Sequence, residues 1–261
     1  MKSKTKSNKN QQSSSDKNKP SSFPPSLLLT NKSNNNFNKK TNNNNNNDKQ
    51  NNYRNINVKT LVPSAVFVSS NFLSEKECQA WIQHAEHIIG FEHMNSPQTR
   101  EYAHRECGRI QVNDWDMAQL LYNRMKPIVD EIEKQVVVSS NSTYRPICCN
   151  GNLRIYKYEK NMSFGRHYDG SDSIKRFDGG NTEITVLIYL SSCEGGATRF
   201  YLPHNKKGKQ NNKNSDGIAF VPQAGAILLH MHGDRCLEHE ADPVVNGVKY
   251  VLRTDIVYAR V

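Results

Sequence analysis

The hydrophobic pattern of the chain changes abruptly after its first fifth. Residues 1–54 consist largely of Asn, Lys and Ser, and their one apolar run is three leucines at residues 27–29. Such a segment cannot bury enough apolar surface to offset the entropy that it loses on ordering. We therefore predict a disordered tail over residues 1–57 and a folded domain over residues 58–261.

The first part of this domain, residues 58–145, has the spacing of amphipathic helices. Ser74 and Glu77 form the pattern of a capping box, and Gly90 is a natural helix stop. The apolar residues between them fall on one helical face: Cys78, Trp81, Ile82, Ala85, Ile88 and Ile89. A second helix is predicted over about residues 116–135, where Pro127 is expected to bend it. These helices would support the rest of the domain.

Residues 146–261 change to short alternating or β-branched segments, separated by turns rich in Gly and Asp. The predicted strands cover residues 153–158, 185–190, 218–221, 226–229 and 249–258. Many short strands after two helices favour a mainly β sandwich or barrel with the helices packed outside. Residues 204–216 are rich in Lys and Asn and predict a polar surface loop inserted between two strands.

The charge of the chain lies in its tail. Residues 1–54 hold eleven basic and two acidic residues, a balance of +9, whereas the other 207 hold 24 and 23, a balance of +1. The folded part therefore does not have the basic surface of a sequence-specific nucleic-acid-binding domain. A weak contact of the tail with RNA or a membrane surface stays open beside a purely solvated tail.

Cysteine spacing and hydropathy indicate the compartment. The chain shows no CxxC spacing among its six cysteines: Cys78, Cys107, Cys148, Cys149, Cys193 and Cys236. It also shows neither the apolar stretch of a signal peptide nor a membrane span. These features predict a reduced, intracellular protein, cytoplasmic or nuclear.

Three residues have the types and order of a non-haem iron site. His167 and Asp169 form an HxD pair, whose side chains share one face of an extended strand, and His239 follows 70 positions after Asp169. Two histidines and one carboxylate can hold one face of Fe(II) and leave the other open. His230 and His232 compete with His239 for the distal position. Only His239 has a cation, Lys249, ten residues further on.

Two cations on the last strand can bind the far carboxylate of a dicarboxylic co-substrate. Lys249 and Arg253 are four residues apart and so lie on one face, about 13 Å from each other. They are too far apart to hold one small carboxylate together. Lys249 is favoured, and Arg253 stays open as the alternative.

These motifs resemble the prolyl 4-hydroxylase-like branch of the 2-oxoglutarate- and Fe(II)-dependent dioxygenases, from about residue 65 to residue 261. The matching segments are residues 72–78, 158–169, 185–190 and 195–200, the Pro222/Gly225 turn, and His239 with Pro243, Val244, Gly247 and Lys249. Asn161 and Met162 stand where the family has Gly-Gln, and the polar insertion has no counterpart.

The resemblance implies a double-stranded β-helix, or jelly-roll and cupin-like, fold with N-terminal helices packed against it. His167, Asp169 and His239 would bind Fe(II), Lys249 would hold the distal carboxylate of 2-oxoglutarate, and Tyr158 would hydrogen-bond it. The implied reaction consumes O₂, uses ascorbate as reductant, releases succinate and CO₂, and hydroxylates a prolyl residue of a protein or peptide substrate.

Several alternatives stay open at this point. The same site acting on a non-prolyl substrate, a catalytically silent binding module, a zinc or manganese cupin-like protein and an RNA-associated protein each fit part of the pattern. Residues 91–109 and 177–182 are the expected walls of a substrate site. Within them, Arg105 either contacts substrate or caps a helix.

Overall fold

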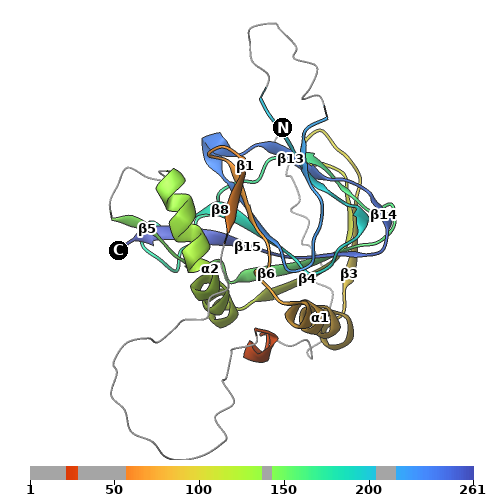
Figure 1. Ribbon diagram of the computed structural model, residues 1–261, viewed down its shortest axis with the longest axis horizontal. Coiled ribbons are helices and arrows are strands. Elements are labelled where there is room, and N and C mark those ends of the chain that lie inside the picture. Colours follow the sequence, from red (N-terminus) through yellow and green to blue (C-terminus); the bar gives the residue numbers. More distant parts are fainter. Residues whose placement is uncertain (1–21, 29–56, 137–142, 204–215) are drawn as a thin grey trace, which may run out of the picture.

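The computed structural model describes residues 22–28, 57–136, 143–203 and 216–261. Its main feature is a 13-stranded antiparallel sheet that curls into a barrel, with the helices outside it (Figure 1). A mainly β, double-stranded β-helix fold with N-terminal helices packed against it was predicted from the sequence, and this prediction is confirmed.

The strands follow one path around the barrel. In sheet order they are β1 (Val58–Val62), β2 (Val66–Ser69), β12 (Ile227–Met231), β8 (Asn181–Tyr189), β15 (Lys249–Arg260), β6 (Asn152–Tyr158), β4 (Arg105–Asn113), β7 (Phe164–His167), β13 (Glu238–Ala241), β10 (Thr198–Tyr201) and β11 (Ile218–Phe220). Two further strands join this path at its side, where β3 (Glu92–Ser96) pairs with β4 and β5 (Tyr144–Cys149) pairs with β15. A separate ribbon is formed by β9 (Glu194–Gly195) and β14 (Val244–Asn246).

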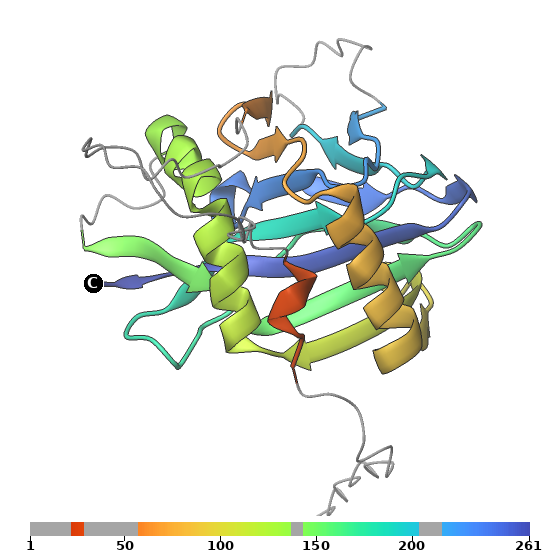
Figure 2. The ribbon, with the colours of Figure 1, turned by 60° about the horizontal axis from the view of Figure 1, so that its bottom comes forward.

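Two helices cover one face of the wide part of this sheet (Figure 2). The first, α1 (Glu75–His84), begins with the predicted capping box, in which the Ser74 hydroxyl accepts from the Glu77 N–H and the Glu77 carboxylate accepts from the Ser74 N–H. It continues as a π-helical turn, η2 (Ala85–Ile89), and stops at Gly90 with a φ of +79°. The second, α2 (Trp115–Gln135), runs through Pro127 as one element.

The main hydrophobic core lies between these helices and the sheet. Trp81 from α1, Met125 from α2 and Ile155 and Ile188 from the sheet are all fully buried in it. Each such side chain contributes about 1.5–3 kcal/mol of burial free energy. A smaller hydrophobic cluster includes Tyr189, Phe200 and Leu228. The helices therefore support the sheet from outside.

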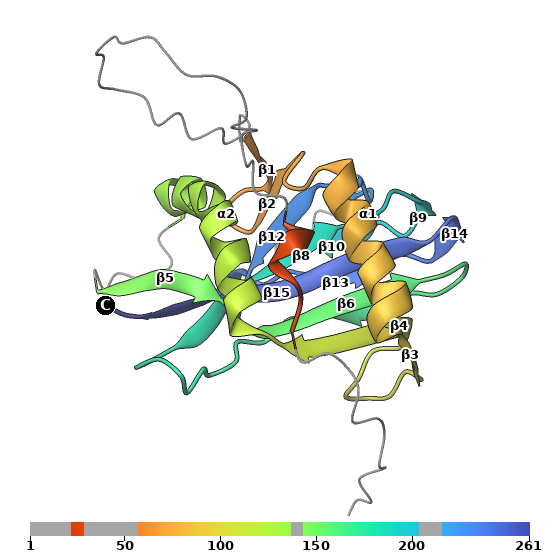
Figure 3. The same ribbon diagram turned by 90° about the horizontal axis from the view of Figure 1, so that it is seen from below.

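A short piece of the predicted disordered tail is an exception. Residues 22–28, which contain the 3₁₀ turn η1 (Pro25–Leu27), lie between α1 and α2 (Figure 3). The Phe23 ring is buried with its centroid 4.9 Å from that of Trp81, and the Phe23 N–H donates to Asp114 Oδ2 over 2.6 Å. Asp114 also caps α2 through Oδ1. The prediction of a disordered tail therefore does not hold for this segment, because its few apolar residues pack between two helices.

Other predictions about the chain fall partly outside the described residues. This is the case for the rest of the tail and for residues 204–215 of the polar insertion. Within the described ranges, no helix has the length and hydropathy needed to cross a membrane. All six cysteines are described, and none forms a disulfide.

Candidate metal centre

The structure brings His167, Asp169 and His239 together in one pocket. The end of β7 carries His167, the following turn carries Asp169, and β13 carries His239 directly opposite His167 in the strand pairing. One ligand atom from each of the three lies within 4.8 Å of the others. Each imidazole Nε2 is 3.7 Å from an oxygen of Asp169. The three side chains that the sequence singled out can therefore converge on one ion.

Backbone carbonyls orient both histidine rings. Nδ1 of His167 lies 2.8 Å from the Gly165 carbonyl oxygen, and Nδ1 of His239 lies 2.9 Å from that of Leu237. A carbonyl oxygen can only accept, so Nδ1 carries the proton and Nε2 presents a lone pair. Burial lowers the pKa of His167 to about 4 and that of His239 to about 2, which keeps both rings neutral. Neutral imidazole is the form that binds a metal.

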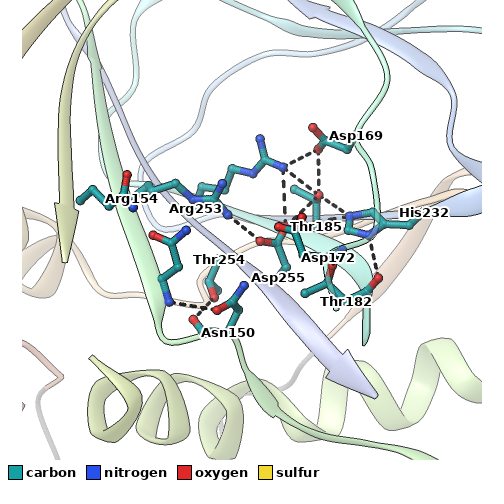
Figure 4. A network of polar contacts seen from close by, with 12 residues as sticks. Asn150, Arg154, Asp169, Asp172, Thr182, Thr185, His232, Arg253, Thr254 and Asp255 are labelled. Carbon is teal, nitrogen blue, oxygen red and sulfur yellow. Dashed lines mark hydrogen bonds and ion pairs between the residues drawn. The ribbon is translucent and has the colours of Figure 1, made fainter. Parts of the chain in front are cut away.

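Asp169 is held as a carboxylate by a cation behind it. Its Oδ2 lies 2.9 Å from Nη2 of Arg253 and 2.8 Å from the Thr185 hydroxyl (Figure 4). Burial alone would raise the pKa of Asp169, but the adjacent Arg253 guanidinium outweighs burial and holds the pKa well below its usual value. Because these contacts fall on Oδ2, Oδ1 stays on the side of His167 and is free to bind an ion.

Arg253 itself belongs to a buried polar network. Its Nη2 lies 3.6 Å from Asp255 Oδ1, while Nη2 of Arg154 lies 2.5 Å from Asp255 Oδ2. The side chains of this network therefore alternate between positive and negative charge, in the order Arg154, Asp255, Arg253 and Asp169 (Figure 4). In a buried network of this kind, the loss of one partner leaves an uncompensated charge.

His232 closes the other side of this network. Its Nδ1 lies 3.0 Å from the Thr182 carbonyl oxygen, so this nitrogen carries the proton, and Nε2 lies 2.8 Å from the Thr185 hydroxyl. Burial lowers the pKa of His232, so the ring is neutral and Nε2 accepts. The single Thr185 hydroxyl proton therefore has three competing acceptors, which are His232 Nε2, Asp169 Oδ2 and Asp255 Oδ1. His232, one of the two competing candidates for the distal ligand, lies behind Asp169 instead of beside the other imidazoles.

The same pocket is lined by a buried ammonium group. Lys249 is 2% exposed, and its Nζ donates to the Gly196 carbonyl oxygen over 2.6 Å. Lys249 stands opposite Tyr158 in the pairing of β15 with β6, with Nζ 5.5 Å from the Tyr158 ring centroid. Among the described residues, no carboxylate lies within ion-pair distance of Nζ. Burial lowers the pKa of Lys249 to about 8.

One pocket is lined by all six residues that the sequence proposed for the site: Tyr158, His167, Asp169, His239, Lys249 and Arg253. The same pocket therefore contains the three potential ligands and the buried ammonium group. Arg253, the alternative carboxylate binder, is instead engaged with Asp169, a contact across the barrel that strand periodicity does not reveal.

Two further pocket residues were not assigned from the sequence. Arg105 lies at the start of β4, with its guanidinium carbon 4.2 Å from the Tyr156 ring centroid and 4.4 Å from that of Phe164. It therefore lines the pocket and does not cap a helix. His230 on β12 also lines the pocket, with its ring centroid 4.5 Å from that of His239. The sequence alone does not reveal that His230 lines the pocket, because this depends on the register in which β12 pairs with β8.

Part of the chain matches a known protein family. Residues 153–254 match the model of the 2OG-Fe(II) oxygenase superfamily. No curated protein matches the chain.

Several solved structures are similar to this chain at low identity. A viral collagen prolyl hydroxylase from Paramecium bursaria Chlorella virus-1 is 17% identical, with 75% of this chain and 96% of that chain covered and a TM-score of 0.48. A Pseudomonas putida prolyl-4-hydroxylase is 14% identical, with 76% and 94% covered and a TM-score of 0.46. An α-ketoglutarate-dependent epimerase from nogalamycin biosynthesis is also 14% identical, with 76% and 79% covered and a TM-score of 0.46.

Proposed function

Because residues 153–254 match the model of the 2OG-Fe(II) oxygenase superfamily, we propose that this chain is a 2-oxoglutarate- and Fe(II)-dependent dioxygenase that hydroxylates a prolyl residue of a protein or peptide. One observation carries the co-substrate assignment. A buried ammonium group without a carboxylate partner, Lys249, shares its pocket with two neutral imidazoles and a carboxylate.

The donor set fits ferrous iron. His167 and His239 would offer their Nε2 atoms and Asp169 would offer Oδ1, and one ligand atom of each residue lies within 4.8 Å of the other two. Two imidazoles and one carboxylate with open positions opposite them are typical of oxygen-activating non-haem iron sites. When bound, Fe(II) supplies O₂ activation coupled to the oxidative decarboxylation of 2-oxoglutarate to succinate and CO₂, with one oxygen atom entering a substrate C–H bond. Ascorbate is the proposed reductant that keeps the iron ferrous.

The residues of this chain bind and orient the co-substrate. Lys249 would pair with the distal carboxylate of 2-oxoglutarate, and the Tyr158 hydroxyl would donate to the same group. A buried ammonium group is stabilised when an anion replaces its lost hydration, so the binding free energy of the dicarboxylate offsets the desolvation of Lys249. Burial raises the pKa of Tyr158, which keeps its hydroxyl protonated as a donor.

The proline assignment rests on the sequence motifs. The HxD segment, the Gly195–Gly196 turn and the distal His239/Lys249 pair resemble the prolyl 4-hydroxylase-like branch. Arg105, clamped between Tyr156 and Phe164 at the pocket wall, would face the primary substrate. Its guanidinium is held in place by two rings and so can donate to a peptide carbonyl with little loss of entropy.

The test follows 2-oxoglutarate consumption by the full chain with Fe(II) and ascorbate against a panel of proline-containing peptides. Mass spectrometry then locates an added oxygen. We expect succinate release together with a prolyl residue heavier by one oxygen, and loss of both after His167→Ala or Asp169→Ala. Oxygen on a different residue type would overturn the proline assignment alone. Full turnover in those two variants would overturn the proposed iron site.

A further inference from the structure

His230 is a buried histidine that the proposed reaction does not use. It is 1% exposed on β12, and neither Nδ1 nor Nε2 makes a hydrogen bond to the described residues. Its Nε2 lies 3.3 Å from Asp169 Oδ2, but without hydrogen-bond alignment. Buried polar groups are almost always hydrogen-bonded, and one without a partner calls for an explanation such as a role in binding an ion.

Two further ligand atoms lie beside this ring. Cys236 follows the short turn η3 (Gly233–Arg235), and His239 follows on β13. One ligand atom each from His230, Cys236 and His239 lies within 4.8 Å of the other two. The Cys236 thiol makes a long contact of 3.8 Å to the Leu237 carbonyl oxygen and also interacts with the backbone of Asp169.

The three residues offer a donor set that differs from that of the iron site. Iron oxygenase sites of the His/His/carboxylate type use nitrogen and oxygen donors, whereas this second group replaces the carboxylate with a sulfur. Two imidazoles and a thiolate, with water as the fourth ligand, suit the tetrahedral preference of Zn²⁺. Thiolate donors select zinc and other soft metals over oxygen-preferring cations.

We propose that His230, Cys236 and His239 form a zinc site that overlaps the iron site and excludes iron from it. The two sites share His239. Since Nδ1 of His239 is committed to the Leu237 carbonyl oxygen, Nε2 is its one available nitrogen, and it can bind one ion at a time. Zinc binding replaces the thiol proton of Cys236 with the metal and releases that proton to solvent. The sharing of His239 links this inference to the proposed function, but zinc binding itself does not depend on dioxygenase activity.

The direct test is a Co²⁺ titration of the metal-free full chain. Cobalt bound by a thiolate gives an intense near-ultraviolet charge-transfer absorption that nitrogen and oxygen ligands do not give. We expect this absorption in the wild type and its loss in Cys236→Ser. Cys193→Ser serves as the matched control, because Cys193 is likewise half-buried but lies outside this group of residues. Its absorption should equal that of the wild type.

Calorimetry with Zn²⁺ gives the second readout. We expect at least about tenfold weaker zinc binding in Cys236→Ser and in His230→Phe. Fe(II)-dependent turnover should be unchanged in Cys236→Ser. Thermal unfolding of the metal-free protein should also be unchanged. Asp169→Ala should keep the cobalt charge-transfer absorption while losing turnover, which separates this inference from the iron site. Absence of the absorption in the wild type, or equal zinc affinity in Cys236→Ser and wild type, would overturn the proposal.

Discussion

Nη2 of Arg253 lies 2.9 Å from Oδ2 of Asp169, so a buried guanidinium stands directly behind the carboxylate that is proposed to bind iron. This contact uses one carboxylate oxygen and leaves the other facing His167. It also explains why a carboxylate can remain charged in a buried pocket. Arg253 is therefore a positioning residue for the proposed centre.

Replacement of this arginine should weaken metal binding. Arg253→Met leaves Asp169 without its cation, so we expect about 10–100-fold weaker binding of Fe(II) or Mn(II), as is typical when a partner of a metal ligand is lost. Breaking a buried ion pair should also lower the free energy of unfolding by about 3 kcal/mol. Metal titration and chemical denaturation measure the two effects.

Arg154→Met is the matched control for this change. Arg154 pairs with Asp255 in the same network but does not contact Asp169. We expect a similar loss of stability with a much smaller loss of metal affinity. Equal metal affinities in wild type and Arg253→Met would show that the guanidinium does not position Asp169.

Thr185→Val should have a weaker effect on the same carboxylate. The Thr185 hydroxyl has one proton, for which Asp169 competes with His232 and Asp255 as acceptor. Its removal should cost about 1–3 kcal/mol of unfolding free energy, because a buried acceptor loses its donor. Metal affinity should fall less than in Arg253→Met, since the charged contact remains. A larger loss of affinity in Thr185→Val would reverse this order and contradict the assignment of Arg253 as the main support.

The buried ammonium group predicts a pH dependence. Below pH 8 Lys249 is protonated and can pair with the distal carboxylate of 2-oxoglutarate; above its folded pKa of about 8 the charge is lost. We expect kcat/KM for 2-oxoglutarate to fall as pH rises through about 8. Lys249→Arg keeps its charge and should remove this fall, whatever its overall activity. A wild-type profile that stays flat to pH 10 would contradict the prediction.

The lowered pKa of Lys249 also affects stability, but its contribution to the free energy of unfolding rises with pH. A lysine in the unfolded chain titrates near pH 10.4, about two units above the folded value. Between these values the unfolded chain holds more protons than the folded one, so the Lys249 contribution to the free energy of unfolding rises with pH over this window. Denaturation of wild type and Lys249→Met from pH 7 to 10 would detect it as a difference in slope.

The docked N-terminal segment should stabilise the domain. Phe23 is buried against Trp81, and its backbone is bonded to the residue that caps α2. Phe23→Ala should lower the free energy of unfolding by up to about 3 kcal/mol, and deletion of residues 1–28 should lower it by at least as much. Dioxygenase turnover should persist in both, because the segment lies outside the barrel. Unchanged denaturation after the deletion would show that docking contributes no stability.

Periodicity and residue order predicted much of this molecule. The capping box at Ser74 located the first helix, and the HxD pair with its distal histidine located three side chains that the barrel brings together. A cation lies ten residues after His239 but not ten residues after His232, and this difference distinguished the two candidate ligands. These signals are local along the chain or depend on order alone, so a single sequence carries them.

Contacts across the barrel were not predictable in this way. The pairing of Arg253 with Asp169 depends on how β15 faces the turn after β7, and strand alternation fixes only the face of the sheet on which Arg253 lies. The docking of residues 22–28 was missed for a different reason. A composition averaged over 54 residues hides a short apolar segment. The two helices that bury this segment follow it in the chain, so its own sequence does not reveal the contact.

The central claim is that one pocket holds a metal at His167, Asp169 and His239 and 2-oxoglutarate at Lys249. The most direct test is calorimetric titration of 2-oxoglutarate, without oxygen, into the full chain loaded with Mn(II) as a redox-silent substitute for iron. We predict that 2-oxoglutarate binds only when the metal is present. Its affinity should be about 10–100-fold weaker in Lys249→Met, because that variant loses one charge-assisted hydrogen bond. The affinity for Mn(II) should be unchanged. Equal affinity for 2-oxoglutarate in the two proteins, or binding that is indifferent to the metal, would contradict the claim.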